Sequence, residues 1–242
     1  MLRIVSIFLR LFVLLISIKI TTTFAQAEIL WDNWYTVTDH GAPNSYYNEK
    51  VEVAGDHIKI QVNTWIADGK TIHMENLGAS AKNTPLLEPL LYNFRTKENG
   101  IDKSIDGTII NGGKVFSIKV THGTKVEVPL RAEMLPKLIL ASFFPVWVHK
   151  NYKRISGVQP IEFTAILEDQ VEKQVPIVKG TAYEMNADDF SKKTNTRKLR
   201  IEFGKVVWFW YVTKKGDAIR IDLPRLDKQI NQVSKEKALK FL

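Results

Sequence analysis

Hydrophobic and polar residues alternate with a period of two along much of the chain, and turn residues separate the runs. This alternation is typical of antiparallel strands that lie on one core, and it predicts three hairpins with ordinary turn residues. The paired runs are 58–66 with 71–75, 104–110 with 115–120, and 206–213 with 218–223. Further β-like runs cover residues 31–38, 47–53, 161–167 and 175–183.

Residues 130–144 depart from this rhythm, because their apolar side chains recur at helical spacing, as at Leu130, Met134 and Leu138. We expect a helix here that begins or kinks at Pro136 and ends before Pro145. The segment has almost no polar face, so a sheet has to cover it.

The run Trp208-Phe209-Trp210-Tyr211 is aromatic at four successive positions. On a strand, Trp208 and Trp210 share one face, while Phe209 and Tyr211 share the other. Both faces must therefore be shielded from water, and a ligand, a helix or a partner that packs on the second face would shield it.

Composition narrows the class of protein. The 242 residues are 45% hydrophobic and include no cysteine, which excludes a disordered polymer, a cysteine-ligated metal protein and a disulfide-stapled mini-domain. The 34 Lys and Arg against 26 Asp and Glu leave only a modest positive balance. A chain of this length usually forms one large β domain.

The first 27 residues have the features of an export signal. Arg3 and Arg10 precede or flank an apolar run, no acidic residue occurs before Glu28, and Ala25-Gln26-Ala27 places small residues two apart. We expect a signal peptide over residues 1–27, cleaved after Ala27, and a periplasmic or secreted protein. The alternative is an uncleaved N-terminal anchor, which also implies export.

Several segments together resemble the half-barrel of periplasmic lipoprotein carriers, the LolA-like fold, including its uncharacterised exported bacterial members. They are the export signal, the strand pair at 47–53 and 57–66, the segment 86–91, the mid-chain helix and the hairpin at 208–217. The resemblance covers roughly residues 34–224 and implies a mainly β protein. Its antiparallel half-barrel sheet of about ten strands would wrap over one apolar helix. We expect this domain over 28–225 and a basic amphipathic helix or tail over 226–242.

A half-open sheet with an apolar inner surface can bind a hydrophobic ligand such as a lipid or an acylated protein without any catalytic group. The candidate lining residues are apolar and lie on the predicted strands or helix. They are Trp65, Leu87, Leu91, Phe94, Leu138, Phe143, Phe144, Trp147, Trp208 and Trp210. The alternative is that these side chains simply form the close-packed core.

No motif for catalysis is present. The five histidines are scattered without a zinc-binding spacing, and there is no Gly-X-Ser-X-Gly, no thiol and no phosphate-binding loop. Acid pairs such as Asp102 with Asp106 are the remaining candidates, for glycan hydrolysis, but Asp188-Asp189 has the pattern of a helix N-cap. We therefore expect no enzyme, no cofactor and no metal.

A cluster of basic residues lies in the polar stretch 192–200, and this stretch predicts an exposed loop before a strand. Its members are Lys192, Lys193, Arg197, Lys198 and Arg200. A competing hypothesis is an envelope scaffold or interaction protein, which binds a partner protein or an anionic surface through this cluster and the aromatic face. A nucleic acid partner is not expected, because no recognition fold is signalled.

Overall fold

The computed structural model describes residues 27–68, 71–98, 100–120, 125–130, 137–168 and 177–240. The expected signal segment, apart from Ala27, lies outside the described residues. The strands are β1 (Glu28–Asp39), β2 (Ala42–Ala54), β3 (His57–Asp68), β4 (Thr71–Lys82), β5 (Pro89–Glu98), β6 (Ile101–Ile110), β7 (Val115–Val120), β8 (Lys125–Pro129), β9 (Leu138–Leu140), β10 (Ile161–Ile166), β11 (Ile177–Glu184), β12 (Arg197–Phe203), β13 (Val206–Val212), β14 (Ala218–Leu223) and β15 (Lys228–Val233). The described helices are α2 (Phe144–Asn151), α3 (Asp189–Thr194) and α4 (Lys235–Leu239), with short 3-10 turns η1 (Asn111–Gly113), η3 (Ala141–Phe143) and η5 (Pro224–Leu226).

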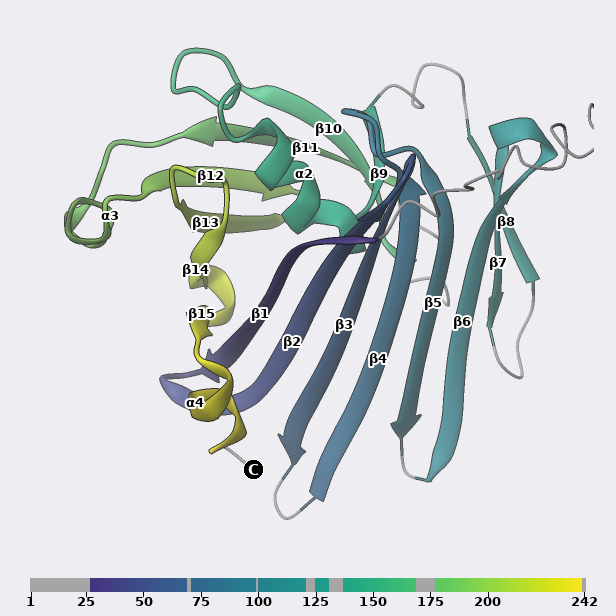
Figure 1. The fold of residues 1–242 in the computed structure, drawn as a ribbon, viewed down its shortest axis with the longest axis horizontal. Helices are drawn as coiled ribbons and strands as arrows, with labels where there is room; N and C mark the ends of the chain where they lie inside the picture. Colours follow the sequence, from purple (N-terminus) through teal and green to yellow (C-terminus); the bar gives the residue numbers. More distant parts are fainter. Residues whose placement is uncertain are drawn as a thin grey trace, which may run out of the picture.

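All of the described strands belong to one open sheet, in the order β8-β7-β6-β5-β4-β3-β2-β1-β15-β14-β13-β12-β11-β10-β9. Neighbours are antiparallel except for β9 and β10, which are parallel. The two ends of the described chain meet in the middle of the sheet, because β1 pairs with both β2 and β15. Figure 1 shows β1–β8 as one array and β10–β13 as a second, with α2 lying between them.

The strands of the three predicted hairpins are confirmed as β3–β4, β6–β7 and β13–β14. The sheet has 15 strands among the described residues, so the expectation of about ten was wrong. Three of the additional strands lie where the sequence pattern favoured something else. β9 lies within the predicted helix over 130–144, β15 lies within the expected helix or tail over 226–242, and β12 begins within the predicted basic loop.

The predicted helix over 130–144 is wrong for its described part. Leu138–Leu140 form β9, Ala141–Phe143 form a 3-10 turn, and α2 begins at Phe144, where the helix was expected to end. Pro145 lies in the first turn of α2, a position that tolerates proline because its N–H would have no intrahelical partner. A short apolar run buried on both faces of a parallel strand cannot be told from a buried helix by its pattern.

The buried carboxylate of Glu168 holds the link between β9 and α2. Its two oxygens accept hydrogen bonds from the backbone N–H of Ala141 at 3.0 Å and from the N–H and hydroxyl of Ser142 at 3.2 and 2.7 Å. These bonds satisfy donors at the start of the 3-10 turn that have no partner within the turn itself. The chain is thereby directed from the sheet into α2.

The basic amphipathic helix or tail expected over 226–242 is α-helical only in part. Residues Lys228–Val233 form β15, which is hydrogen-bonded to β14 on one side and β1 on the other. The α-helix in the described part of this segment is α4, and the Ser234 side chain caps it by accepting from the Lys237 N–H. The tail therefore belongs to the domain, because strand pairing on both sides satisfies its backbone more completely than an isolated surface helix would.

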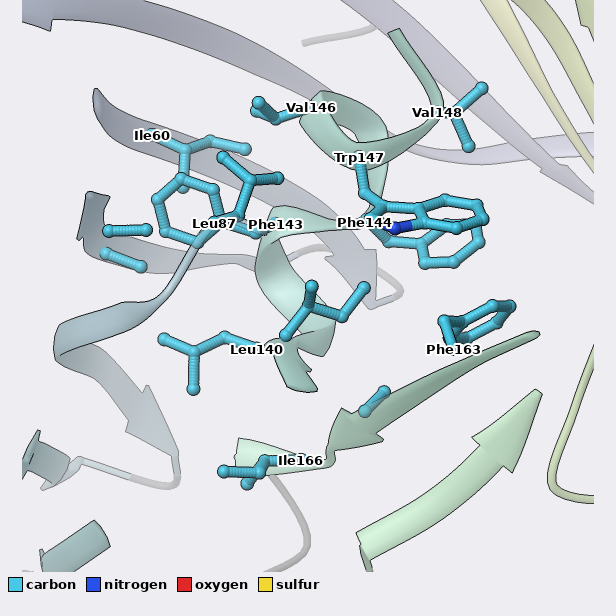
Figure 2. Packing of buried hydrophobic residues seen from close by; sticks show 14 of the residues in the cluster. Ile60, Leu87, Leu140, Phe143, Phe144, Val146, Trp147, Val148, Phe163 and Ile166 are labelled. Atoms are coloured by element: carbon cyan, nitrogen blue, oxygen red, sulfur yellow. The ribbon is translucent and has the colours of Figure 1, made fainter. Parts of the chain in front are cut away.

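The core lies between α2 and the face of the sheet that we call the inner face. One cluster joins Val146 and Val148 of α2 to Val51 and Ile60 of β2 and β3, and all four are fully buried. Figure 2 shows three aromatic members of the same cluster, Phe144, Trp147 and Phe163, packed together. Among the described residues, no helix has the length and apolar character needed to cross a membrane.

Candidate functional site

A row of apolar side chains crosses five neighbouring strands on the inner face. Val62 on β3 pairs with Leu77 on β4, then follow Phe94 on β5, Ile105 on β6 and Val120 on β7, each the register partner of the one before. Register partners point to the same face of a sheet, so the five side chains lie side by side. We call them the apolar row.

The apolar row lies at the margin of the packed core. Its five members are half-buried, whereas the row two residues away along each strand is fully covered. That covered row consists of Val51, Ile60, Ala79, Tyr92 and Ile118, with Gly107 on β6. The apolar row therefore borders the buried row on one side, and part of its own surface is open to solvent.

A polar row bounds the apolar row on its other side. Thr64, Glu75, Thr96 and Lys103 are register partners across β3, β4, β5 and β6, and they lie two residues from Val62, Leu77, Phe94 and Ile105. The inner face thus passes from buried apolar to half-buried apolar to polar along the direction of the strands. This order leaves a band one residue row wide in which an apolar ligand can replace water.

Glu49 of β2 continues the apolar row beyond Val62, which is its register partner on β3. Its side chain is 5% exposed and accepts a hydrogen bond from Trp31 Nε1 at 2.8 Å. Burial raises the pKa of Glu49 to about 7, although the indole hydrogen bond acts in the opposite direction. Sequence reasoning missed this residue. The available signal was a carboxyl at an inward position of the alternation Tyr47, Glu49, Val51.

The predicted lining residues do not gather on one open surface. Six belong to the packed core with exposures of 0 to 7%, namely Leu87, Leu138, Phe143, Phe144, Trp147 and Trp210. Phe94 is the one that lies in the apolar row. Trp208 is half-buried and stacks on Trp210 with ring centroids 6.2 Å apart.

Two further lining candidates lie on the outer face, opposite α2. The register pairs Trp65 with Tyr46 and Leu91 with Ser80, in positions that alternate with the inner-face residues. Trp65 stacks on Tyr46 with ring centroids 4.9 Å apart, and Leu91 is 46% exposed. Trp65 and Leu91 therefore cannot line a cavity on the inner face.

The second aromatic face of β13 is covered by a short helix and by cations. Phe190 of α3 contacts the Tyr211 ring edge-on with centroids 4.8 Å apart, and Lys198 Nζ lies 4.7 Å from the centroid of Phe209. Arg220 lies over the Phe190 ring at 4.5 Å. The second aromatic face of residues 208–211 is therefore packed partly against a helix, which was one of the three kinds of cover expected from the sequence.

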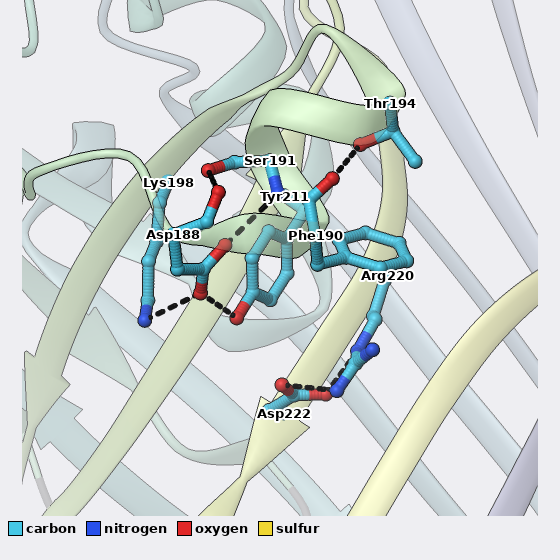
Figure 3. A network of polar contacts seen from close by, with 8 residues as sticks. All are labelled: Asp188, Phe190, Ser191, Thr194, Lys198, Tyr211, Arg220 and Asp222. Atoms are coloured by element: carbon cyan, nitrogen blue, oxygen red, sulfur yellow. Dashed lines mark hydrogen bonds and ion pairs between the residues drawn. The ribbon is translucent and has the colours of Figure 1, made fainter.

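Asp188 holds α3 in this position, as Figure 3 shows. Its carboxylate accepts from the Ser191 N–H at 2.9 Å, from Lys198 Nζ at 2.8 Å and from the Tyr211 hydroxyl at 2.9 Å. Burial raises the pKa of Asp188, but these hydrogen bonds outweigh it and hold the pKa well below the usual range. The predicted N-cap is thereby confirmed.

The basic cluster does not form a loop. Lys192 and Lys193 are exposed on α3, whereas Arg197, Lys198 and Arg200 lie on β12. Each of the β12 cations is ion-paired: Arg197 with Glu184 at 2.7 Å, Lys198 with Asp188 at 2.8 Å, and Arg200 with Glu202. The cluster therefore presents less uncompensated charge than its composition suggested.

A cleft of about 710 Å³ lies where the loop after β4 meets the start of β10. Leu86, Trp147 and Ile161 contribute apolar surface, while Arg154 and Glu162 contribute charge. Its volume suits a small molecule. The Lys137–Glu162 ion pair at 2.9 Å and the other polar walls make it less suited to an acyl chain than the apolar row.

Within the described ranges, no group of three or more His, Cys, Asp or Glu side chains could hold a metal ion. No family model and no curated protein matches this chain. The crystal structure of a DUF1089 family protein from Pseudomonas aeruginosa is similar over 76% of this chain and 90% of its own length, with 10% sequence identity and a TM-score of 0.43. A similarity this loose carries no information on function.

Proposed function

We propose that this protein is an exported, non-enzymatic component of the bacterial cell envelope that binds or transfers a hydrophobic ligand, either a lipid or an acylated protein. In this proposal the sheet works as a half-barrel of the LolA-like kind, and the acyl chain lies along the apolar row. The observation that carries the proposal is the in-register row of five half-buried apolar side chains at the margin of the core.

The dimensions and energetics of the row suit an extended hydrocarbon chain. Strands are about 4.8 Å apart, so the row from Val62 on β3 to Val120 on β7 spans roughly 19 Å. Each methylene group that the row removes from water contributes about 0.8 kcal/mol. A dozen methylene groups would then supply on the order of 10 kcal/mol before the cost of immobilising the chain, with no need for a catalytic residue.

The competing hypothesis of a scaffold that binds a polyanion receives less support. Arg197, Lys198 and Arg200 are compensated by carboxylates, which reduces the field that an anionic surface would experience. The exposed cations Lys192 and Lys193 alone would contribute only about 1 kcal/mol each near such a surface. Acyl-chain binding is therefore the function that we propose.

The test is native mass spectrometry, with organic extraction, of the full chain purified gently from its own envelope. We expect a hydrophobic species to copurify with the wild-type protein and to be lost from Phe94→Asp and Ile105→Asp. Leu91→Asp is the matched control, because Leu91 lies on β5 like Phe94 but is exposed on the outer face. It should retain the ligand.

A cooperative urea transition for each variant shows that the domain is folded. A wild-type protein free of any hydrophobic species, or equal retention by Phe94→Asp and Leu91→Asp, would refute the proposal. Two inner-face variants are used so that one that does not fold leaves the other to decide.

A further inference from the structure

A small cavity lies beside Glu49, which is the register partner of Val62 at the end of the apolar row. Its volume is about 10 Å³, which is room for about one group of the size of a water molecule. Trp31 and Glu49 contribute from β1 and β2, His149 from α2, Trp210 from β13, and Asp217 from the turn before β14. Three distant parts of the chain therefore meet at this point on the inner side of the sheet.

Two residues that line the cavity carry an acceptor and a donor without a partner in the described structure. The carboxylate of Glu49 is the acceptor, with one hydrogen bond from Trp31 already in place. Trp210 is 1% exposed, and within the described residues its buried indole Nε1 has no hydrogen-bond partner. An indole N–H can only donate, so Trp210 needs an acceptor. Leaving it buried and unpaired costs about 1–3 kcal/mol.

His149 adds a second polar atom without a hydrogen bond. Its Nδ1 is buried and lies 3.4 Å from Asp217 Oδ1, but no hydrogen bond is formed in the described structure. The ring of His149 lies against Trp31 with centroids 5.0 Å apart, which keeps it beside Glu49. The Glu49 carboxyl, the Trp210 indole and the His149 ring thus surround one small space.

We propose that the ligand carries a hydroxyl at its polar end and that this hydroxyl occupies the cavity, donating to Glu49 and accepting from Trp210 Nε1. The inference rests on the proposed function, in which the apolar part of the same ligand lies along the apolar row. The register supports this placement, because Glu49 is the direct partner of Val62. The ligand class is a hydroxyl-bearing amphiphile, such as a long-chain alcohol or a glyceride.

Other polar groups match the cavity less well. An ammonium group offers donors only and leaves the Trp210 N–H unpaired. A carboxylate offers acceptors only, and above the Glu49 pKa of about 7 it meets the charge of Glu49 at close range, with Asp217 nearby. A trimethylammonium or phosphate group has several heavy atoms and exceeds the space for one water-sized group. A hydroxyl has one heavy atom and both functions.

The experiment is equilibrium dialysis of the full chain against decanol and decyl methyl ether at about pH 8.5, where Glu49 is ionised and accepts a charge-assisted hydrogen bond. We expect decanol to bind about tenfold more tightly than the ether, because only decanol donates a hydrogen bond. Trp210→Phe removes the N–H and keeps an aromatic ring, and it should reduce the decanol affinity severalfold.

Trp208→Phe is the matched control, because the Trp208 Nε1 is also buried without a partner in the described structure but Trp208 does not line this cavity. It should keep both the affinity for decanol and the preference over the ether. Glu49→Leu removes the acceptor and should abolish the preference. If Trp210→Phe does not fold, Glu49→Leu still tests whether a hydroxyl binds in the cavity.

The outcomes separate the two proposals. Equal affinities of the wild-type protein for decanol and the ether would overturn the hydroxyl site and leave the apolar row in place. A preference that survives in Glu49→Leu, or a decanol affinity unchanged by a folded Trp210→Phe, would also overturn the site. Failure of both compounds to bind would overturn the hydroxyl site together with the proposed function.

Discussion

Replacing Glu49 by Gln should remove a loss of stability that the wild-type protein suffers between mildly acidic and neutral pH. Glu49 is 5% exposed, and its carboxyl accepts a hydrogen bond from the Trp31 indole. Burial raises its pKa from the ordinary 4.5 to about 7. The folded protein therefore holds a proton that the unfolded chain releases over this range.

The sign and size of the effect follow from linkage. A pKa that is raised on folding contributes stability that is fully present below about pH 4.5 and is lost as the pH rises through about 7. The difference between 4.5 and about 7 corresponds to about 3 kcal/mol, at about 1.4 kcal/mol for each unit of pKa. Above the folded pKa the penalty stays constant, because Glu49 is then ionised in both states.

The assay is urea unfolding of wild type and Glu49→Gln at a series of pH values from about 4.5 to about 8, with the difference in unfolding free energy plotted against pH. The amide side chain of the variant keeps an oxygen that can accept from Trp31 but carries no titrating proton. We expect the variant to gain about 3 kcal/mol on the wild-type protein across the range.

Glu52→Gln is the control for this assay, because Glu52 lies on the same strand but on the outer face, where it pairs with Lys50 at 2.5 Å. It should follow the pH dependence of the wild-type protein. Parallel pH profiles for Glu49→Gln and wild type would refute the view that Glu49 is a desolvated carboxyl on the inner face.

Two further predictions concern the packing of the second array of strands. Asp188→Ala removes the N-cap of α3 and the acceptor for Lys198, so the unfolding free energy should fall by about 2 kcal/mol and α3 should lose hydrogen-exchange protection. Asp189→Ala, at an exposed position in the first turn, should cost no more than about 0.5 kcal/mol in the same urea assay, and equal losses would contradict the capping role. Gly180→Ala should lower the thermal midpoint through a loss of about 1–3 kcal/mol, because the added Cβ meets the Phe163 ring and a backbone carbonyl. An unchanged midpoint would show that this contact can relax.

The strands of the three hairpins and the cap at Asp188 could be predicted from sequence because their causes are local. Alternation of side chains decides which face of a strand is apolar, and a carboxyl three residues before a free N–H decides where α3 begins. The run 31–38 and the run 47–53 became β1 and β2 for the same reason. Export, the LolA-like resemblance and the absence of enzymatic activity stay predictions from sequence.

The tertiary structure decided the conformation of the segment from Leu138 to Asn151 and of the tail over 226–242. Apolar residues at helical spacing are equally compatible with a short strand buried on both faces, and only the parallel partner β10 selects the strand for Leu138–Leu140. The tail pattern of apolar and cationic residues fits a surface helix, but the open backbone edges of β1 and β14 accept β15 between them.

At the candidate site, too, the sequence predicted some features and the tertiary structure decided others. Phe94 and Trp210 could be named from sequence as apolar residues of the sheet, but their roles differ because exposure depends on what packs over each strand. Glu49 and Trp210 are far apart in the chain, and only the tertiary structure brings them to one cavity. Sequence by itself determined the strands and the inward alternation of their side chains, because these depend on neighbours along the chain. Which inward side chains are covered, which stay open and which polar atoms share a cavity was decided only by tertiary packing, because burial is a property of contacts between distant segments.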